Sequence, residues 1–363
     1  MTRRDFCALL PFAGAAAPAR IKAFCVDFNW RRPRNPGWHN DFARPGHWAD
    51  ASPAEHVAWY EALGANVIQT FCVSCNGYAW YKNGFVPQQP GLKHDFLPEM
   101  VELGHRKGML VLGYFCAGAN TKWGQDHPEL SYGSPSTLHI PFTDEYLDYL
   151  CRSITDAVRR TKIDGYMLDW VWPPDDKLRE KGWSDCERKL YEKLTGKTFP
   201  VGGRPGAAEK LAYERAAIER CWARVREATK KASPDCIIWL TCNNLTDSRV
   251  IDTRMLREAD WVLNEAPNAE YYARARKMVG PQTRLIQCLV GWPGHDARAY
   301  LFDRSRGDND LYGFAEPGDN SLPRPVSEYL SKPVSAFTGT DPKAANDRNI
   351  AALARFYRGL PVD

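Results

Sequence analysis

The sequence lacks several features that would place it in well-known classes of protein. Its net charge of +4 is not clustered along the 363 residues, so no basic stripe could follow the phosphates of a nucleic acid. No apolar run is long enough to cross a bilayer. No G-x-G-x-x-G turn follows the first predicted strand, which disfavours a doubly wound dinucleotide-binding sheet. We therefore expect neither a nucleic-acid partner nor an integral membrane segment.

The first twenty residues, MTRRDFCALLPFAGAAAPAR, differ from the rest of the chain. Arg3 and Arg4 precede a short apolar stretch and the small-residue run AAAPA. This is the layout of a twin-arginine export signal with a cleavage site near residues 17–19. We expect residues 1–20 to be a signal peptide, residues 21–363 to form the domain, and the protein to be periplasmic or extracellular. The alternative is a frayed cytosolic tail.

Cysteine is plentiful, with 11 residues, but its positions do not suggest disulfides. Six cysteines fall within or at the ends of predicted strands, where a free thiol behaves as a small buried hydrophobe: Cys25, Cys72, Cys116, Cys236, Cys242 and Cys288. The segment CVSC (72–75) has the spacing of redox and metal sites. No second Cys/His pair at zinc-finger spacing accompanies it, so we expect no metal and no cofactor.

Short apolar, β-branched runs alternate with helical patterns along the chain, which predicts βα units and a parallel sheet. The predicted helices cover 52–64, 95–108, 143–161, 207–232, 248–258, 268–279 and 343–358. The predicted strands cover 21–30, 65–72, 109–115, 163–172, 235–242, 260–265, 284–292 and 310–316. Eight strands in this alternation, with 44% hydrophobic residues to fill a core, predict a single (β/α)8 TIM barrel.

The loops that follow the strands are long and aromatic, whereas those that lead into strands are short. The long ones cover 73–85, 117–142 and 173–186. In a TIM barrel these loops form the C-terminal face, where active sites are built. Polar residues at the ends of the predicted strands are therefore the candidate site residues: Asp27, Asn29, Asp169, Asn243, Glu265 and Glu316. Asp164 begins a strand on the opposite face, and we interpret it as structural.

Asp169 and Glu265 are the best catalytic pair among these residues. Two carboxyl groups across a glycosidic bond can hydrolyse it, one as nucleophile or water-activating base and the other as proton donor. Strand parity allows both side chains to point inward. We expect neighbouring donors to keep Asp169 ionised, and desolvation to raise the pKa of Glu265. If either Asp169 or Glu265 is not catalytic, Asp27 and Glu316 are the alternative candidates.

Tryptophan is abundant, with 13 residues, and several follow predicted strand ends. Indole rings in such places are common platforms for sugar rings. We expect a substrate-binding set made of Asp27, Asn29, Trp30, Trp170, Trp172, Asn243, Trp292 and Glu316.

Several segments carry a resemblance to a known family. The stretches VDFNW, GANVIQTFC, HDFLPEMVELGHRKGMLVLGYF, IDGYMLDWVW and CERKLYEKLTGKTFP occur in this order. The chain resembles the glycosyl hydrolase families related to the family 29 α-L-fucosidases, most clearly over residues 20–200. The resemblance implies that Asp169 matches the strand-4 nucleophile of a retaining α-glycosidase. It implies no particular sugar, because FCVSCNGY stands where those enzymes carry a histidine pair.

We therefore expect a retaining glycoside hydrolase that acts on an α-type linkage, with Asp169 as nucleophile and Glu265 as general acid/base. Its partner would be a glycoside or oligosaccharide. The main alternative is a barrel that binds carbohydrate without cleaving it. A further alternative is a metal-assisted hydrolase that uses Cys72, Cys75 and histidines.

Overall fold

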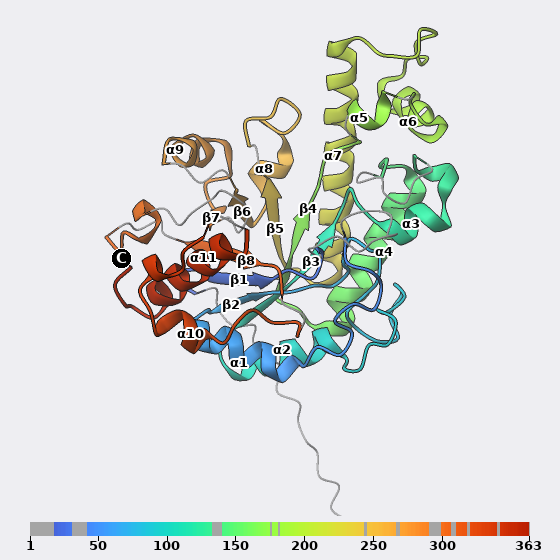
Figure 1. Ribbon diagram of the computed structural model, residues 1–363. Coiled ribbons are helices and arrows are strands. Elements are labelled where there is room, and N and C mark those ends of the chain that lie inside the picture. Colours follow the sequence, from blue (N-terminus) through green and yellow to red (C-terminus); the bar gives the residue numbers. More distant parts are fainter. Residues whose placement is uncertain are drawn as a thin grey trace, which may run out of the picture.

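The chain forms a closed barrel of eight parallel strands that pair in chain order, with β8 next to β1 (Figure 1). The computed structural model describes residues 18–30, 42–132, 140–174, 176–180, 182–242, 245–265, 269–289, 299–305, 310–317, 320–339 and 342–362. The strands are β1 (Lys22–Val26), β2 (Val67–Gln69), β3 (Leu110–Cys116), β4 (Gly165–Asp169), β5 (Ile237–Cys242), β6 (Trp261–Asn264), β7 (Arg284–Leu289) and β8 (Leu311–Ala315). The predicted (β/α)8 barrel is confirmed. The predicted export signal lies almost entirely outside the described residues and stays a prediction.

Helices separate the strands and surround the barrel (Figure 1). They are α1 (Pro53–Leu63), α2 (Phe96–Arg106), α3 (Thr121–Asp126), α4 (Asp144–Thr161), α5 (Asp176–Arg179), α6 (Asp185–Thr195), α7 (Ala207–Ala232), α8 (Arg254–Glu258), α9 (Ala269–Met278), α10 (Val326–Leu330) and α11 (Pro342–Tyr357). The helix predicted over 248–258 is wrong in its first half, because Asp252 adopts a left-handed φ of 61° and the helix begins only after Thr253. The segment 173–186 is also not all loop, since it contains α5.

Helix α1 shows how local signals set the element boundaries. The Ser52 hydroxyl accepts a hydrogen bond from the Glu55 N–H at 3.4 Å, and Pro53 occupies the first turn, where its missing N–H costs nothing. Gly64 ends the helix with a φ of 85°, which few other residues adopt without strain. These caps fix where the chain turns back into β2.

The connection between β4 and β5 is much larger than the others. It contains α5, α6 and the long α7, and the three helices lie together at one side of the barrel (Figure 1). Its small core is centred on Trp183, Tyr191 and Tyr213. Beneath it, Arg179 contacts Glu187 Oε1 at 2.7 Å and Glu214 Oε1 at 2.6 Å. Because all three ionic side chains are buried, removing Arg179 would leave two buried carboxylates without their cation.

The cysteines of the described chain are free, and most are buried. Cys25, Cys72, Cys116, Cys236 and Cys288 are buried thiols, as predicted. The side chain of Cys242 lies outside the described set. No helix in the described ranges combines the length and apolarity needed to cross a membrane.

Candidate active site

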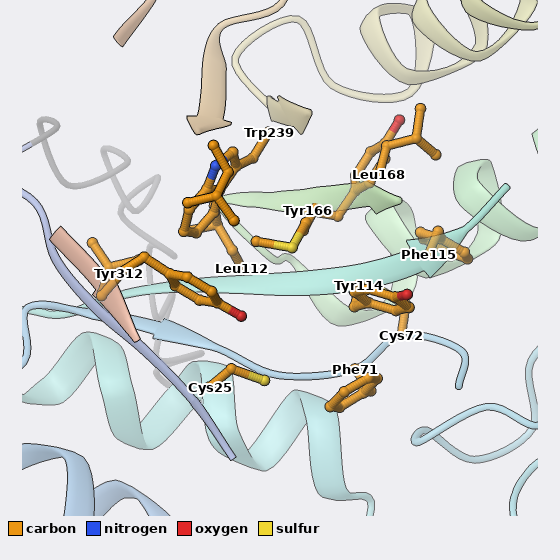
Figure 2. Close-up of a cluster of buried hydrophobic side chains, with 14 of the residues drawn as sticks. Cys25, Phe71, Cys72, Leu112, Tyr114, Phe115, Tyr166, Leu168, Trp239 and Tyr312 are labelled. Atoms are coloured by element: carbon orange, nitrogen blue, oxygen red, sulfur yellow. The ribbon is translucent and has the colours of Figure 1, made fainter. Parts of the chain in front are cut away.

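A cavity of about 300 Å³ opens at the C-terminal end of the barrel. Pairs of residues two positions apart line it, because alternate side chains of a strand point to the same face. The lower layer contains Cys25, Gln69, Met167, Leu263 and Tyr312, and the layer above it contains Asp27, Phe71, Asp169, Glu265 and Phe314. Figure 2 shows Cys25, Phe71, Tyr114 and Tyr312 among the side chains of the barrel interior. The strands thus bring three carboxyl groups from β1, β4 and β6 to one space.

Asp169 is the last residue of β4, and two hydrogen bonds fix its carboxyl group. Its Oδ2 atom accepts from the Tyr114 hydroxyl at 2.7 Å, and its Oδ1 atom accepts from the Trp170 N–H at 2.7 Å. Trp170 has a φ of 51°, a left-handed conformation that is unusual for a bulky side chain. Backbone strain of this kind is concentrated at functional sites. The strained backbone at Trp170 therefore keeps its N–H in hydrogen-bond contact with the Asp169 carboxylate.

Glu265 follows β6 directly and lines the same cavity. Its Oε1 atom accepts a hydrogen bond from the Thr241 hydroxyl of β5 at 2.7 Å. Burial raises the pKa of Glu265, with the Thr241 hydrogen bond acting weakly in the opposite direction. The predicted direction of this pKa shift is confirmed.

The carboxyl groups of Asp169 and Glu265 influence each other. Burial, followed by the charge of Glu265, raises the pKa of Asp169 to about 8 against the hydrogen bonds from Tyr114 and Trp170. The expectation that nearby donors keep Asp169 ionised is therefore wrong. The donors are present, but burial and the second carboxylate outweigh them. The charge of Glu265 therefore disfavours the ionisation of Asp169.

Asp27 is a third buried carboxyl group in the cavity. Its Oδ1 atom accepts the Asn29 N–H at 2.8 Å, while the Asn29 side-chain oxygen accepts the Cys75 N–H at 2.8 Å. Burial raises the pKa of Asp27 to about 7, and the charge of Glu316 adds to the shift. Asp27 and Asn29 therefore lie where the sequence predicted. Glu316 is half-buried and close enough to act on Asp27, but it is not part of the cavity lining.

Tryptophans form part of the cavity wall, as the substrate-binding prediction requires. Trp30, Trp170 and Trp172 all line it and are half-buried. The ring centroids of Trp30 and Trp170 are 6.3 Å apart, and Phe42 packs against both rings. Such a cluster presents flat apolar surface beside the acids.

Two predicted residues, Asn243 and Trp292, lie outside the described residues. In the other direction, sequence reasoning missed Tyr114 and Thr241, which bind the two acids directly. Both lie inside apolar strand sequences, LVLGYFC and IIWLTC. One signal could have identified them. The alternation of side chains along each strand turns both residues toward the barrel interior, as it does the residues at the ends of the neighbouring strands.

The CVSC segment does not form part of an evident metal site. Within the ranges that the structure describes, no group of three or more His, Cys, Asp or Glu side chains could hold a metal ion. Cys72 and Cys75 are both buried. The Cys72 sulfur lies against Gly113, where a Cβ atom would come within 2.2 Å of it. Cys75 instead contacts the active-site tyrosine, Tyr114, at 3.7 Å.

Asp164, interpreted as structural, lies before the first residue of β4. Its Oδ2 atom contacts His105 Nε2 at 2.9 Å and accepts the Val111 N–H at 2.7 Å. The hydrogen bond with Asp164 raises the pKa of His105. The structural interpretation is confirmed.

We predict that Asp169→Asn stabilises the protein at high pH. Because the pKa of Asp169 rises from 3.8 to about 8 on folding, the folded state holds more protons than the unfolded state between these values. The stability of the parent therefore falls as pH rises through this window, and an uncharged amide removes that loss. The Tm of the variant should equal that of the parent near pH 4 and exceed it by roughly 3 °C at pH 8.

Asp164→Asn is the matched control for this experiment, because it removes a carboxylate of the same strand that is stabilised by two donors. It should lower the Tm at both pH values. A Tm of Asp169→Asn below that of the parent at pH 8 would show that burial and the charge of Glu265 do not destabilise the ionised carboxylate of Asp169.

One segment of the chain matches a family of glycosyl hydrolases. Residues 52–170 match the sequence profile of the family described as Hypothetical glycosyl hydrolase 6. This segment covers β2 to the end of β4 and includes Asp169. The predicted resemblance to glycosyl hydrolases is confirmed over these residues. Among curated proteins, none matches the chain significantly.

Solved structures share the fold at low sequence identity. The α-L-fucosidase isoenzyme 2 from Paenibacillus thiaminolyticus superposes with a TM-score of 0.63 at 14% identity, over 92% of this chain and 48% of that one. The glycoside hydrolase domain of PgaB (BpsB) from Bordetella bronchiseptica gives a TM-score of 0.56 at 12% identity, over 86% and 97%. The chain thus spans about half the length of the fucosidase. At these identities the likeness establishes the barrel fold alone.

Proposed function

We propose that this barrel is a retaining glycoside hydrolase that cleaves an α-type glycosidic bond. The observation that carries the proposal is the pair of Asp169 and Glu265, two acids that line one aromatic-walled cavity and whose pKa values are both raised by burial. A hydrolase of this kind needs one carboxylate and one carboxylic acid at the same time. The glycosyl hydrolase profile across residues 52–170 supports the same reaction class.

The reactive form is the one in which Asp169 has lost its proton and Glu265 has kept its own. In the first step of this form, Asp169 attacks the anomeric carbon while Glu265 donates its proton to the leaving oxygen. The C–O bond to the leaving group breaks, an alcohol departs, and a covalent glycosyl ester remains on Asp169. Water then attacks the anomeric carbon as Glu265 takes its proton, and the ester bond breaks. Two inversions give net retention. After the first step Glu265 is the only charged member of the pair, which suits it to act as the base.

Substrate contacts come from the remaining lining residues. Asp27 accepts the Asn29 N–H through its Oδ1 atom, and its Oδ2 atom is the acceptor for a sugar hydroxyl. Trp30, Trp170 and Trp172 offer indole faces to the apolar side of a sugar ring. The α preference rests on the family resemblance of the Asp169 segment.

Activity on nitrophenyl α- and β-glycosides of fucose, galactose, glucose and arabinose tests this function. We expect hydrolysis of at least one α-glycoside, with the α anomer as the first sugar product in NMR spectra recorded during turnover. Release of the β anomer would instead indicate inversion. Sugar binding without turnover across the panel would indicate a binding protein and contradict the proposal.

A further inference from the structure

The thiol of Cys75 lies behind the tyrosine that binds Asp169. Cys75 Sγ is 3.7 Å from the Tyr114 hydroxyl oxygen, which is in turn 2.7 Å from Asp169 Oδ2. Both Cys75 and Tyr114 are buried. The CVSC segment therefore has a place in the candidate active site that neither metal binding nor redox chemistry explains.

The number of protons available determines which group donates in each hydrogen bond between Cys75, Tyr114 and Asp169. A tyrosine hydroxyl carries one proton. In the reactive form, where Asp169 is ionised, the short contact between Tyr114 and Asp169 uses this proton. The oxygen of Tyr114 can then only accept from Cys75, so the thiol is the donor. Burial raises the pKa of both Cys75 and Tyr114 well above their ordinary values, which keeps both groups protonated as donors.

The backbone of Cys75 holds the thiol in this position. Its N–H donates to the Asn29 side-chain oxygen at 2.8 Å. Its carbonyl oxygen accepts the Thr121 N–H at 3.0 Å and the Thr121 hydroxyl at 3.3 Å. Cys75 thus connects the end of β1, where Asp27 lies, with the start of α3. A residue anchored at both backbone groups has little freedom to turn its side chain away from Tyr114.

We infer that Cys75 and Tyr114 are positioning residues that form a hydrogen-bond relay. The Cys75 thiol donates to the Tyr114 hydroxyl, which donates to the Asp169 carboxylate. The relay holds Asp169 in place both when it attacks the sugar and when it is released from the glycosyl ester. The inference rests on the proposed function, in which Asp169 is the nucleophile. Hydrogen bonds in a chain strengthen one another, so a donor behind Tyr114 makes its hydroxyl a better donor to Asp169. No proton is transferred along the relay during turnover.

The relay has its greatest effect in the second step of the reaction. When the glycosyl ester breaks, Asp169 regains its negative charge, and a donor already in place stabilises that charge. Without the relay the covalent intermediate should accumulate, so that kcat and KM fall together. The groups that face Asp169 are Glu265 from β6, Asp27 from β1 and Tyr114 from β3. Of these three side chains Tyr114 favours the ionised form of Asp169, as does the backbone N–H of Trp170.

Four variants test the relay in the full-length protein, with the nitrophenyl glycoside that the parent hydrolyses best. Tyr114→Phe should lower kcat by about 30-fold and also lower KM, and it should move the acidic limb of the pH profile of kcat/KM upward by about one unit. Cys75→Ala should give changes of the same sign but smaller, about 5-fold in kcat. Cys75→Ser keeps a donor and should stay within about twofold of the parent.

Tyr166→Phe is the matched control, because this β4 tyrosine is equally buried but its hydroxyl lies 2.6 Å from the Thr229 hydroxyl. Cys72→Ala controls for loss of the other CVSC thiol. Both should leave the acidic limb in place. If Tyr114→Phe and Cys75→Ala shift the limb no more than these controls, the relay is wrong. Covalent labelling of Asp169 in the parent by a fluorosugar tests the proposed function separately, so the two failures can be told apart.

Discussion

Asp169→Ala should lower kcat/KM for a nitrophenyl glycoside by roughly 10⁴-fold, which corresponds to about 5 kcal/mol of transition-state stabilisation. The loss should be large because, in the proposed mechanism, this side chain forms the covalent intermediate, held by the hydroxyl of Tyr114 and the N–H of Trp170. Initial rates with the best substrate of the panel measure the effect.

Azide provides the positive test of the same variant. Alanine leaves room for a small anion on the face from which Asp169 would attack, so azide should restore turnover and give a glycosyl azide of inverted configuration. Asp176→Asn is the control, because this carboxylate is exposed on α5 and pairs with Lys210. It should retain full activity. Residual activity of Asp169→Ala above about one tenth of the parent would remove this residue from the covalent step.

Glu265→Ala should show a strong dependence on the leaving group. For glycosides with a poor leaving group, such as an alkyl or sugar alcohol, we expect a loss of about 10³-fold, which is within the usual range for general acid catalysis. For a dinitrophenyl glycoside the first step needs no proton donor and should remain fast. The covalent intermediate then accumulates, because no base activates water. A burst of dinitrophenolate measures this directly.

Azide again separates this variant from the nucleophile variant. It needs no general base, so it should accelerate Glu265→Ala with the dinitrophenyl substrate and give a glycosyl azide of retained configuration. Glu316→Gln is the comparison variant, since Glu316 is one of the two alternative candidates for a catalytic acid and lies outside the cavity lining. Equal losses across all leaving groups for Glu265→Ala, or a leaving-group dependence in Glu316→Gln, would assign the proton donor elsewhere.

Much of the barrel could be predicted because short segments of the sequence determine where its strands and helices form. Each strand is a short apolar run, most are followed by a helical pattern, and caps such as Ser52 and Gly64 mark the boundaries of α1. Strand parity then allowed Asp169 and Glu265 to point inward, since residues two apart share a side, and Asp27 was a candidate because it lies at a strand end. The structure brings all three into one cavity.

The parts that could not be predicted depend on contacts between distant segments. Tyr114 looks like a core residue of LVLGYFC, and only the register of β3 beside β4 brings its hydroxyl to Asp169. The high pKa of Asp169 likewise depends on Glu265, 96 positions later in the sequence. Composition alone did not reveal that α5, α6 and α7 share a small core closed by Arg179 and its buried carboxylates.

The central claim is that Asp169 forms the glycosyl-enzyme, and covalent trapping tests it most directly. A slow fluorosugar with an activated leaving group, based on the sugar that the panel identifies, should inactivate the enzyme with one label per chain. After trypsin digestion, tandem mass spectrometry should find the label on Asp169, within the peptide that covers residues 163–177. A label on Asp27 or Glu265, or steady turnover of a good substrate with no label at all, would contradict the claim.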